Sequence, residues 1–316
     1  MSDDGFITAK CRLLEIFANY DNSELENIEK WISSQAYKKG EVITDLEKKK
    51  SLLKGEKKLK KIGDYINKLI PFEAEMATES ISPPVVGDQA DCNKNNTCHI
   101  DEFLYDENQV EDLVKKGKVN RHYCLDCNSR NVKELTYISH SMSRRALQYI
   151  FHVLLPKDLE NKQLVDIGSR LGAVLYGAYN FSNASKIVGI EINKEFCDVQ
   201  EAAINKFSMQ KERIEVIHAD VMTREDIVQS ADIIVINVLD FFVDVDKHKE
   251  MWFFFKKHIK KGCYLVANRS MAETLGYLDI YEEFMDWLTI CKPFQLDNEI
   301  FFEVEDYSEL YLYSIN

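Results

Sequence analysis

A strand, a turn, a helix and a second strand follow one another in residues 164–193, and this order constrains the fold of the chain more than any other feature. The first strand is apolar and carries an acid, Asp166, shortly before a turn that contains Gly168 and Gly172. An apolar helix follows, and the second apolar strand reaches an acid, Glu191, near its end. Such a βαβ unit is typical of a doubly wound α/β sheet, whose ligands bind outside the carboxyl ends of the strands. The segment therefore predicts a ligand site beside the two acids.

The glycine spacing argues against a dinucleotide or a nucleoside triphosphate as the ligand. A dinucleotide site needs G-x-G-x-x-G, but this turn reads G-x-x-x-G, and Arg170 stands where the second glycine would let a phosphate approach. The P-loop pattern G-x-x-x-x-G-K-[ST] occurs nowhere in the chain. Asp166 would repel a pyrophosphate. S-adenosylmethionine carries a sulfonium and an ammonium group and no phosphate, so it suits these acids, and Glu191 is placed to accept both ribose hydroxyls.

Each of these residues also has a purely structural interpretation. The glycine pair is compatible with an ordinary strand-to-helix turn, Asp166 with a helix cap and Glu191 with a solvated strand end. Their joint order and spacing favour the cofactor site. The residues predicted to bind the cofactor are Asp166, Gly168, Ser169, Gly172, Glu191, Ile192, Asp220, Val221 and Asn237.

Composition limits the classes of protein to which the chain can belong. With 316 residues, 45% of them apolar, and no apolar run of the ~20 residues that a membrane helix needs, it predicts a soluble globular protein. The N-terminus lacks a secretory apolar region, so we expect a cytoplasmic or nuclear protein with no membrane partner. The net charge of −13 argues against a broad nucleic-acid footprint. One lysine cluster, at 37–61, is either a solvated helix face or a docking site for nucleic acid or an acidic protein surface.

Three regions follow from the distribution of apolar residues, prolines and glycines. We predict an N-terminal helical region at 1–72, a linker with a small Cys/His-rich insert at 73–136, and an α/β domain at 137–316. The last region is expected to open with an amphipathic helix at 139–156, capped by Ser139 or Ser141 and stopped by Pro156.

Apolar runs in the α/β domain predict the strands of a seven-stranded, doubly wound Rossmann-like sheet. Five runs of branched aliphatic residues are typical of parallel strands buried on both faces, at 163–167, 186–192, 214–219, 232–237 and 263–268. A helix at 279–290 and an antiparallel hairpin formed by 300–304 and 310–314 are expected to complete the domain.

The motif Asp-Ile-Gly-Ser-x-x-Gly, with the following Gly-Ile-Glu, resembles motif I and the next acid of the class I S-adenosylmethionine-dependent methyltransferases. The resemblance covers 137–316 and implies the seven-stranded sheet of that class. It also implies that Asp220, at the end of the third strand, accepts a hydrogen bond from the adenine amino group. The structural alternative for Asp220 is a helix cap.

A later segment, Ile-x-Val-Ile-Asn leading to Phe241, is similar to the non-SET histone lysine methyltransferases of the disruptor-of-telomeric-silencing type. The patterns of that family are Asp-Leu-Gly-Ser-Gly-x-Gly and Val-Asn-Asn-Phe-x-Phe, so Arg170 and Val238 depart from it. The similarity implies methyl transfer to an amino group, namely that of a protein lysine. Asn237 would be the catalytic residue that positions the amine or the methionyl end of the cofactor, and Phe241 and Phe242 would wall a channel.

Two other functions remain open. An RNA methyltransferase would dock its substrate through the lysine cluster at 37–61, although the strand tip lacks the Pro-Pro that amino-methylating nucleic-acid enzymes carry. A non-catalytic scaffold with the methyltransferase fold would follow if the side chain of Arg170 occluded the cofactor loop.

Four cysteines of the insert predict a structural zinc site. Cys92 and Cys98 form a C-x5-C pair, and Cys124 and Cys127 form a C-x2-C pair. Tetrahedral zinc needs four such donors, and His99 and His122 compete as ligands. Reduced thiols are the alternative, because disulfide frameworks are rare in intracellular proteins.

Overall fold

The computed structural model describes residues 3–33, 39–84, 90–126, 131–237, 239–303 and 307–316. The chain divides into two compact units, 1–53 and 54–316, which we describe separately. The first unit contains α1 (Asp3–Phe17), α2 (Asn22–Ser33) and the beginning of α3 (Lys39–Ile66). Helices therefore fill most of the described part of 1–72, as the sequence predicts. The domain boundaries drawn from the sequence stay predictions.

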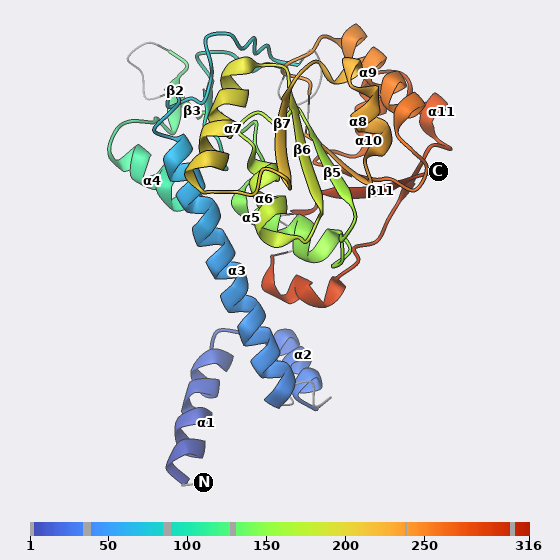
Figure 1. Cartoon of the computed structure of the whole chain (residues 1–316). Helices are drawn as coiled ribbons and strands as arrows, with labels where there is room; N and C mark the ends of the chain where they lie inside the picture. The colour runs from blue at the N-terminus through green and yellow to red at the C-terminus, as the bar shows by residue number, and fades with distance from the viewer. Residues whose placement is uncertain (1–2, 34–38, 85–89, 127–130, 238, 304–306) are drawn as a thin grey trace. The chain divides into compact units, whose positions relative to one another are not determined.

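A mixed seven-stranded sheet forms the centre of the second unit (Figure 1). Its strands are β5 (Gln163–Ile167), β6 (Lys186–Glu191), β7 (Ile214–His218), β8 (Ile233–Ile236), β9 (Tyr264–Ala267), β10 (Leu288–Ile290) and β11 (Tyr311–Ile315). They lie in the order β10-β11-β9-β8-β5-β6-β7. β5 to β9 are parallel, and β11 runs antiparallel to both of its neighbours. The predicted α/β fold with a seven-stranded doubly wound sheet is confirmed.

The strand order reverses at β5, which lies between β6 and β8. The chain first moves outward through α6 (Ala173–Phe181), β6, α7 (Lys194–Lys206) and β7. It then returns through α8 (Glu225–Ser230) to β8 on the other side of β5. Ile167 pairs with Ile190 and with Ile236, so the three central strands end level with one another. Ligands of open α/β sheets bind outside the carboxyl ends of the strands at such a reversal.

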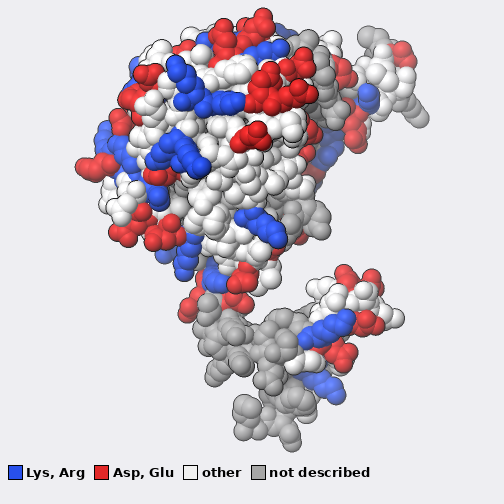
Figure 2. Space-filling view, turned by 90° about the vertical axis from the view of Figure 1, so that its right-hand side faces the viewer, with Lys and Arg blue, Asp and Glu red and all other residues white. Residues whose placement is uncertain are grey.

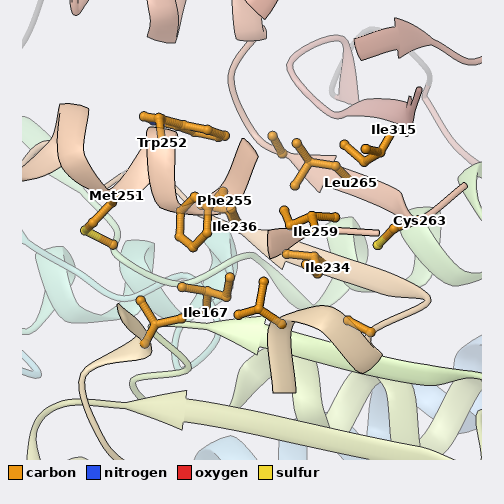
Figure 3. Packing of buried hydrophobic residues seen from close by; sticks show 14 of the residues in the cluster. Ile167, Ile234, Ile236, Met251, Trp252, Phe255, Ile259, Cys263, Leu265 and Ile315 are labelled. Carbon is orange, nitrogen blue, oxygen red and sulfur yellow. The ribbon is translucent and has the colours of Figure 1, made fainter. Parts of the chain in front are cut away.

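Buried aliphatic and aromatic side chains hold α9 (Val245–His258) against the sheet (Figure 3). Trp252 and Phe255 are fully buried, and they belong to one cluster with Ile234 and Ile236 of β8 and Leu265 of β9. Burial of each such side chain is worth ~1.5–3 kcal/mol. This packing fixes β8, and with it the strand end that carries Asn237.

The C-terminal part of the sheet differs from the prediction. The predicted helix at 279–290 is wrong, because α11 (Tyr281–Phe284) is short and the chain then forms β10. The predicted hairpin of 300–304 and 310–314 is also wrong, because β11 pairs with β10 and β9 and not with residues near 300. Ile300 lies in a 3-10 helix, Leu296–Phe301, and its side chain is 70% exposed. It therefore contributes neither a strand nor buried surface to the sheet.

The helix that precedes the sheet begins later than the sequence suggests. α5 (Arg144–Tyr149) is capped by Ser143, whose hydroxyl accepts a hydrogen bond from the amide of Ala146, and it continues as a π-helical turn at Ile150–Leu154. The predicted caps Ser139 and Ser141 are wrong because the helix begins only at Arg144, beyond both of them, and their hydroxyls take part in other contacts. Ser141 Oγ donates to Asp101 Oδ2 at 2.6 Å and Ser139 Oγ to the carbonyl of Ser141 at 2.8 Å.

The insert forms two small ladders. β1 (Thr97–His99) pairs with β4 (Thr136–Ile138) in parallel, and β2 (His122–Cys124) pairs with β3 (Val132–Glu134) in antiparallel fashion. α4 (Glu107–Lys115) lies between β1 and β2 in the sequence. Throughout the described parts of the chain, no helix combines the length and apolarity that crossing a bilayer requires.

Candidate active site

A cavity of about 610 Å³ opens at the carboxyl ends of the central strands, where the strand order reverses. A volume of this size is typical of sites for small molecules and cofactors. Six of the predicted cofactor residues line it, namely Gly168, Glu191, Ile192, Asp220, Val221 and Asn237. The fold therefore brings most of the predicted cofactor residues to one cavity, although they follow four different strands.

Glu191 occupies the end of β6 and is 6% exposed. Its Oε2 accepts from the amide of Arg170 at 2.8 Å, and its Oε1 accepts from the amide of Asn193 at 2.7 Å. Each carboxylate oxygen keeps further acceptor capacity, so the pair matches the two hydroxyls of a ribose. Burial raises the pKa of Glu191, and the two amide hydrogen bonds oppose that shift.

The turn after β5 uses backbone angles that favour glycine. Gly168 has φ +72° and Gly172, the N-cap of α6, has φ +81°. Arg170 lies between them with φ +43°, also in the left-handed region. The lysine methyltransferase pattern has a glycine at the position of Arg170. A non-glycine residue in the left-handed region loses ~1–2 kcal/mol of conformational free energy.

The guanidinium of Arg170 is held by a network that offsets this backbone cost. Arg170 Nε donates to Glu79 Oε1 at 2.9 Å and Nη2 to Glu79 Oε2 at 3.1 Å, while Nη1 lies 3.3 Å from Asp101 Oδ2. Nη2 also donates to the carbonyl of Ala74, and the group lies over the ring of Phe196 at 4.8 Å. Both side chains of the Arg170–Glu79 pair are less than a tenth exposed. The network anchors residues 74–79 beside the cavity.

Three predicted cofactor residues do not line the cavity. Asp166 is buried within β5, and burial together with the neighbouring Glu191 raises its pKa to about 8. Ser169 Oγ donates to Gln200 Oε1 at 2.9 Å, and its carbonyl accepts from the amide of Gly172 at 2.6 Å. The contacts of Ser169 and Gly172 fix the conformation of the turn beside the cavity, and Asp166 lies buried in the strand that precedes this turn.

Asp220 caps a helix, which is its structural alternative, and it also lines the cavity, while its contact with adenine stays a prediction. Its Oδ1 accepts from the amide of Met222 at 2.9 Å and so caps the 3-10 helix Val221–Thr223. Its Oδ2 lies 4.0 Å from Lys247 Nζ at the cavity wall. The cap leaves acceptor capacity on the carboxylate for an amino group of a ligand.

Asn237 links β8 to the segment before α5. Its Nδ2 donates to the carbonyl of His140 at 2.9 Å. Its Oδ1 is buried and has no hydrogen-bond partner among the residues that the structure describes. An unpaired buried acceptor costs about 1–3 kcal/mol, so a donor from a ligand at this place would stabilise the site.

The zinc prediction gains no support from the described residues, among which no group of three or more His, Cys, Asp and Glu side chains could hold a metal ion. Cys92 is buried in an apolar cluster with Ile138 and Phe241 instead. Burial raises the pKa of the Cys98 thiol, with Glu73 and Glu75 adding to the shift. Cys127 lies outside the described residues, so the four-cysteine site itself stays a prediction.

Several cavity residues escaped the sequence analysis. Thr78, Glu79 and Ser80 come from the predicted linker, and His140 comes from the predicted start of a helix. Apolar side chains of Leu239, Val243 and Met251 also line the cavity, together with Phe242, which the sequence analysis predicts as a wall residue. Arg170 was the one clue in the sequence that the linker reaches the cavity. A buried arginine needs carboxylate partners, and Glu79 of the predicted linker is one of them.

The residues present fit S-adenosylmethionine. Glu191 offers paired acceptors for the ribose, Asp220 an acceptor for the adenine amino group, and Asn237 an unpaired buried acceptor for an ammonium or amine. When bound, this cofactor supplies a methyl group activated on a sulfonium. The sheet order and this donor set define a class I S-adenosylmethionine-dependent methyltransferase.

The sequence profile of the O-methyltransferase family matches residues 116–273, which are 158 of the 316 residues. The chain belongs to the O-methyltransferase family and is an S-adenosylmethionine-dependent methyltransferase. This membership favours the enzyme over the non-catalytic scaffold, and the guanidinium of Arg170 is engaged with the linker. The likeness to histone lysine methyltransferases is not reproduced by the family comparison.

Solved structures give distant likenesses only. An O-methyltransferase from Bacillus cereus in complex with S-adenosylhomocysteine is 12% identical, with 56% of this chain and 83% of that chain covered and a TM-score of 0.37. An RNA methyltransferase from Salinibacter ruber in complex with S-adenosylhomocysteine is 14% identical, with 40% and 76% covered and a TM-score of 0.33. An S-adenosylmethionine-dependent O-methyltransferase from Thermotoga maritima is 14% identical, with 49% and 56% covered and a TM-score of 0.37. No curated protein matches the chain.

Proposed function

We propose that the protein transfers the methyl group of S-adenosylmethionine to a hydroxyl oxygen of a small aromatic acceptor. The observation that carries this proposal is the cavity at the strand reversal, which combines cofactor-type acceptors with an apolar wall near Asn237. The O-methyltransferase family description supports oxygen as the methyl acceptor.

The cofactor is assigned to the side of the cavity that carries the acids. Glu191 would bind the ribose hydroxyls and Asp220 the adenine amino group, with Val221 beside the ring. Asn237 would accept from the methionyl ammonium or from the incoming acceptor. Gly168 lines the same cavity, and a Cβ at this position would meet only the side chain of Leu239, at 3.8 Å.

The acceptor is assigned to the apolar side. Leu239, Phe242, Val243 and Met251 line this part of the cavity. An uncharged aromatic ring loses little hydration free energy on entering such surroundings, whereas a charged ammonium would lose much more. This difference favours a phenol-type hydroxyl over a lysine side chain.

A protein lysine is the second candidate acceptor. The unpaired Asn237 Oδ1 could accept a hydrogen bond from an amine, and Phe242 lines the same cavity. Neutralisation of the amine before entry would remove the desolvation penalty. Lysine methylation therefore remains a defined competing outcome of the experiment.

RNA is the third candidate, with docking through the lysine cluster. The described lysines of this cluster belong to α3, where Leu52, Leu59 and Ile62 are buried. On the face drawn in Figure 2, basic and acidic side chains are interspersed around an uncharged area. The net charge of −13 counts against a broad phosphate-binding footprint, so RNA is the weaker proposal.

The experiment offers the purified protein labelled S-adenosylmethionine with three sets of acceptors: simple phenols and catechols, lysine-containing peptides, and total RNA. We expect label in methyl ethers of the phenols. Transfer to peptides or RNA with none to phenols would overturn the oxygen assignment. A protein that binds the cofactor and methylates no member of the phenol set would refute the proposal for this acceptor class.

A further inference from the structure

We propose that residues 74–82, here called the strap, are part of the cofactor site because they position the carboxylate of Glu191 for the ribose. The inference deepens the proposed function and rests on its assignment of the ribose hydroxyls to Glu191. Thr78 and Glu79 are the positioning residues of the strap, which comes from the predicted linker. Both of them line the cavity.

Two backbone amides fix the carboxylate of Glu191. The amide of Arg170 donates to Oε2 at 2.8 Å, and the amide of Asn193 donates to Oε1 at 2.7 Å. Arg170 belongs to the turn after β5, and Asn193 is the N-cap of α7. A carboxylate held at both oxygens presents its remaining lone pairs in set directions. The direction in which Glu191 can accept from a ribose therefore depends on where these two backbone segments lie.

The side chains of the same two residues bind the strap. Arg170 pairs with Glu79 through two hydrogen bonds, from Nε to Oε1 at 2.9 Å and from Nη2 to Oε2 at 3.1 Å. Asn193 Nδ2 donates to Thr78 Oγ1 at 2.9 Å. Two consecutive residues of the strap thus bridge the turn after β5 and the N-terminus of α7. They join the two segments whose amides hold Glu191.

The hydrogen bonds of the Thr78 hydroxyl have one consistent direction. Asn193 Oδ1 accepts from the amide of Glu195 at 2.9 Å, so the amide group of Asn193 turns its Nδ2 toward the strap. Thr78 Oγ1 donates its single proton to Glu195 Oε2 at 2.7 Å and accepts from Asn193. The hydroxyl therefore ties the strap to both the cap and the first turn of α7.

Further contacts hold the two ends of the strap. The carbonyl of Ala74 accepts from Arg170 Nη2, and the amide of Ser82 donates to the carbonyl of Phe241 at 2.9 Å. The side chains of Arg170 and Glu79 are each less than a tenth exposed, so their separation would leave two buried charges unpaired. The strap therefore fixes the ribose acceptor before a ligand arrives. A preformed site loses less free energy in ordering its groups on binding.

The test measures by calorimetry the affinity for S-adenosylhomocysteine and for two analogues, one without either ribose hydroxyl and one without the adenine amino group. Thr78→Val keeps the side-chain volume and removes the hydroxyl, and Glu79→Gln removes the charge that pairs with Arg170. A hydrogen bond is worth ~2- to 10-fold in affinity, so each variant should bind S-adenosylhomocysteine about 5-fold more weakly. The contribution of the ribose hydroxyls should fall by the same factor. The contribution of the amino group, assigned to Asp220 on another strand end, should stay unchanged.

Three controls accompany these variants. Thr78→Ser keeps the hydroxyl and should bind all three ligands as the wild type does. Thr289→Val removes an exposed hydroxyl that donates to Asn316 Oδ1 at 3.1 Å and does not line the cavity, and it should also leave the affinities unchanged. In a Glu191→Ala background, Thr78→Val should cause no further loss, because a positioning residue acts only through the group that it positions.

Several results would overturn the inference. One is an unchanged contribution of the ribose hydroxyls in Thr78→Val, which decides alone if Glu79→Gln does not fold. Another is an equal fall in the contributions of hydroxyls and amino group, which would indicate general loosening of the site. A third is a full 5-fold loss in the Glu191→Ala background, which would mean that Thr78 contacts the ligand itself.

The experiment is independent of the methyl acceptor. A wild type that binds the analogue without ribose hydroxyls as tightly as S-adenosylhomocysteine would overturn the ribose assignment of Glu191 and the inference with it. A wild type that shows the expected affinities and methylates no phenol would overturn the proposed acceptor and leave the role of the strap standing.

Discussion

Replacing Asp166 with asparagine tests the electrostatics of the strand that supports the cofactor turn. Asp166 is 4% exposed, and its pKa of about 8 lies well above the ordinary value of 3.8, because of burial first and of Glu191 second. Between these two values the folded protein holds a proton that the unfolded chain has released. Stability from this group is therefore fully present below pH 3.8 and is lost as the pH rises toward 8.

The magnitude follows from the pKa difference. At 1.36 kcal/mol per pKa unit, integration of the proton linkage between pH 5 and pH 8 gives a loss of about 4 kcal/mol in the free energy of unfolding. Asparagine has nearly the same volume and does not ionise. Asp166→Asn should therefore remove this part of the pH dependence, and at pH 8 the variant should be the more stable protein.

The assay is urea unfolding of both proteins at pH 5 and pH 8. The difference in unfolding free energy between variant and wild type should move by about 4 kcal/mol in favour of the variant over this range. Parallel pH dependences of the two proteins would show that Asp166 ionises normally and would refute the reasoning.

Two further predictions concern the residues beside the cavity. Arg170→Ala leaves the carboxylates of Glu79 and Asp101 buried without their cation, so the free energy of unfolding should fall by about 3 kcal/mol in a urea titration, and an unchanged value would contradict the role of the network. Because burial lowers the pKa of His140 to about 2, its neutral form persists at mildly acid pH, and its ring signals in NMR spectra should not titrate near pH 6.5. A titration with that midpoint would contradict the burial of His140.

The central parallel strands β5, β6, β8 and β9 were predictable from the sequence because they are buried on both faces. Ile233–Ile236 of β8 is a run of four buried aliphatic residues, and its bounds match the prediction within a residue. The three-residue strand β10 was not predictable, since Leu288–Ile290 lies at the sheet edge and two of its residues are exposed. These residues form a strand because they pair with residues of β11, which lie far from them in the predicted order of elements.

The cofactor side of the candidate site was predictable for a different reason. Glu191 and Asp220 follow directly from the strand ends that carry them, so their positions depend on local sequence and on the order of the sheet. His140 and Glu79 reach the cavity through contacts with residues about 100 and 90 positions away, such as Asn237 and Arg170. No local periodicity records such contacts.

The central claim is that the acids at the strand ends bind S-adenosylmethionine, and calorimetric titration of the cofactor tests it most directly. Glu191→Gln removes a charged acceptor and should weaken binding by roughly 10- to 150-fold, as expected for the loss of ~1.5–3 kcal/mol. The control is Glu215→Gln, an acid on β7 whose Oε2 lies 2.7 Å from Lys186 Nζ, outside the cavity lining. The account predicts wild-type affinity for the control and the stated loss for Glu191→Gln. Equal affinity of both variants, or no binding by the folded wild type, would contradict it.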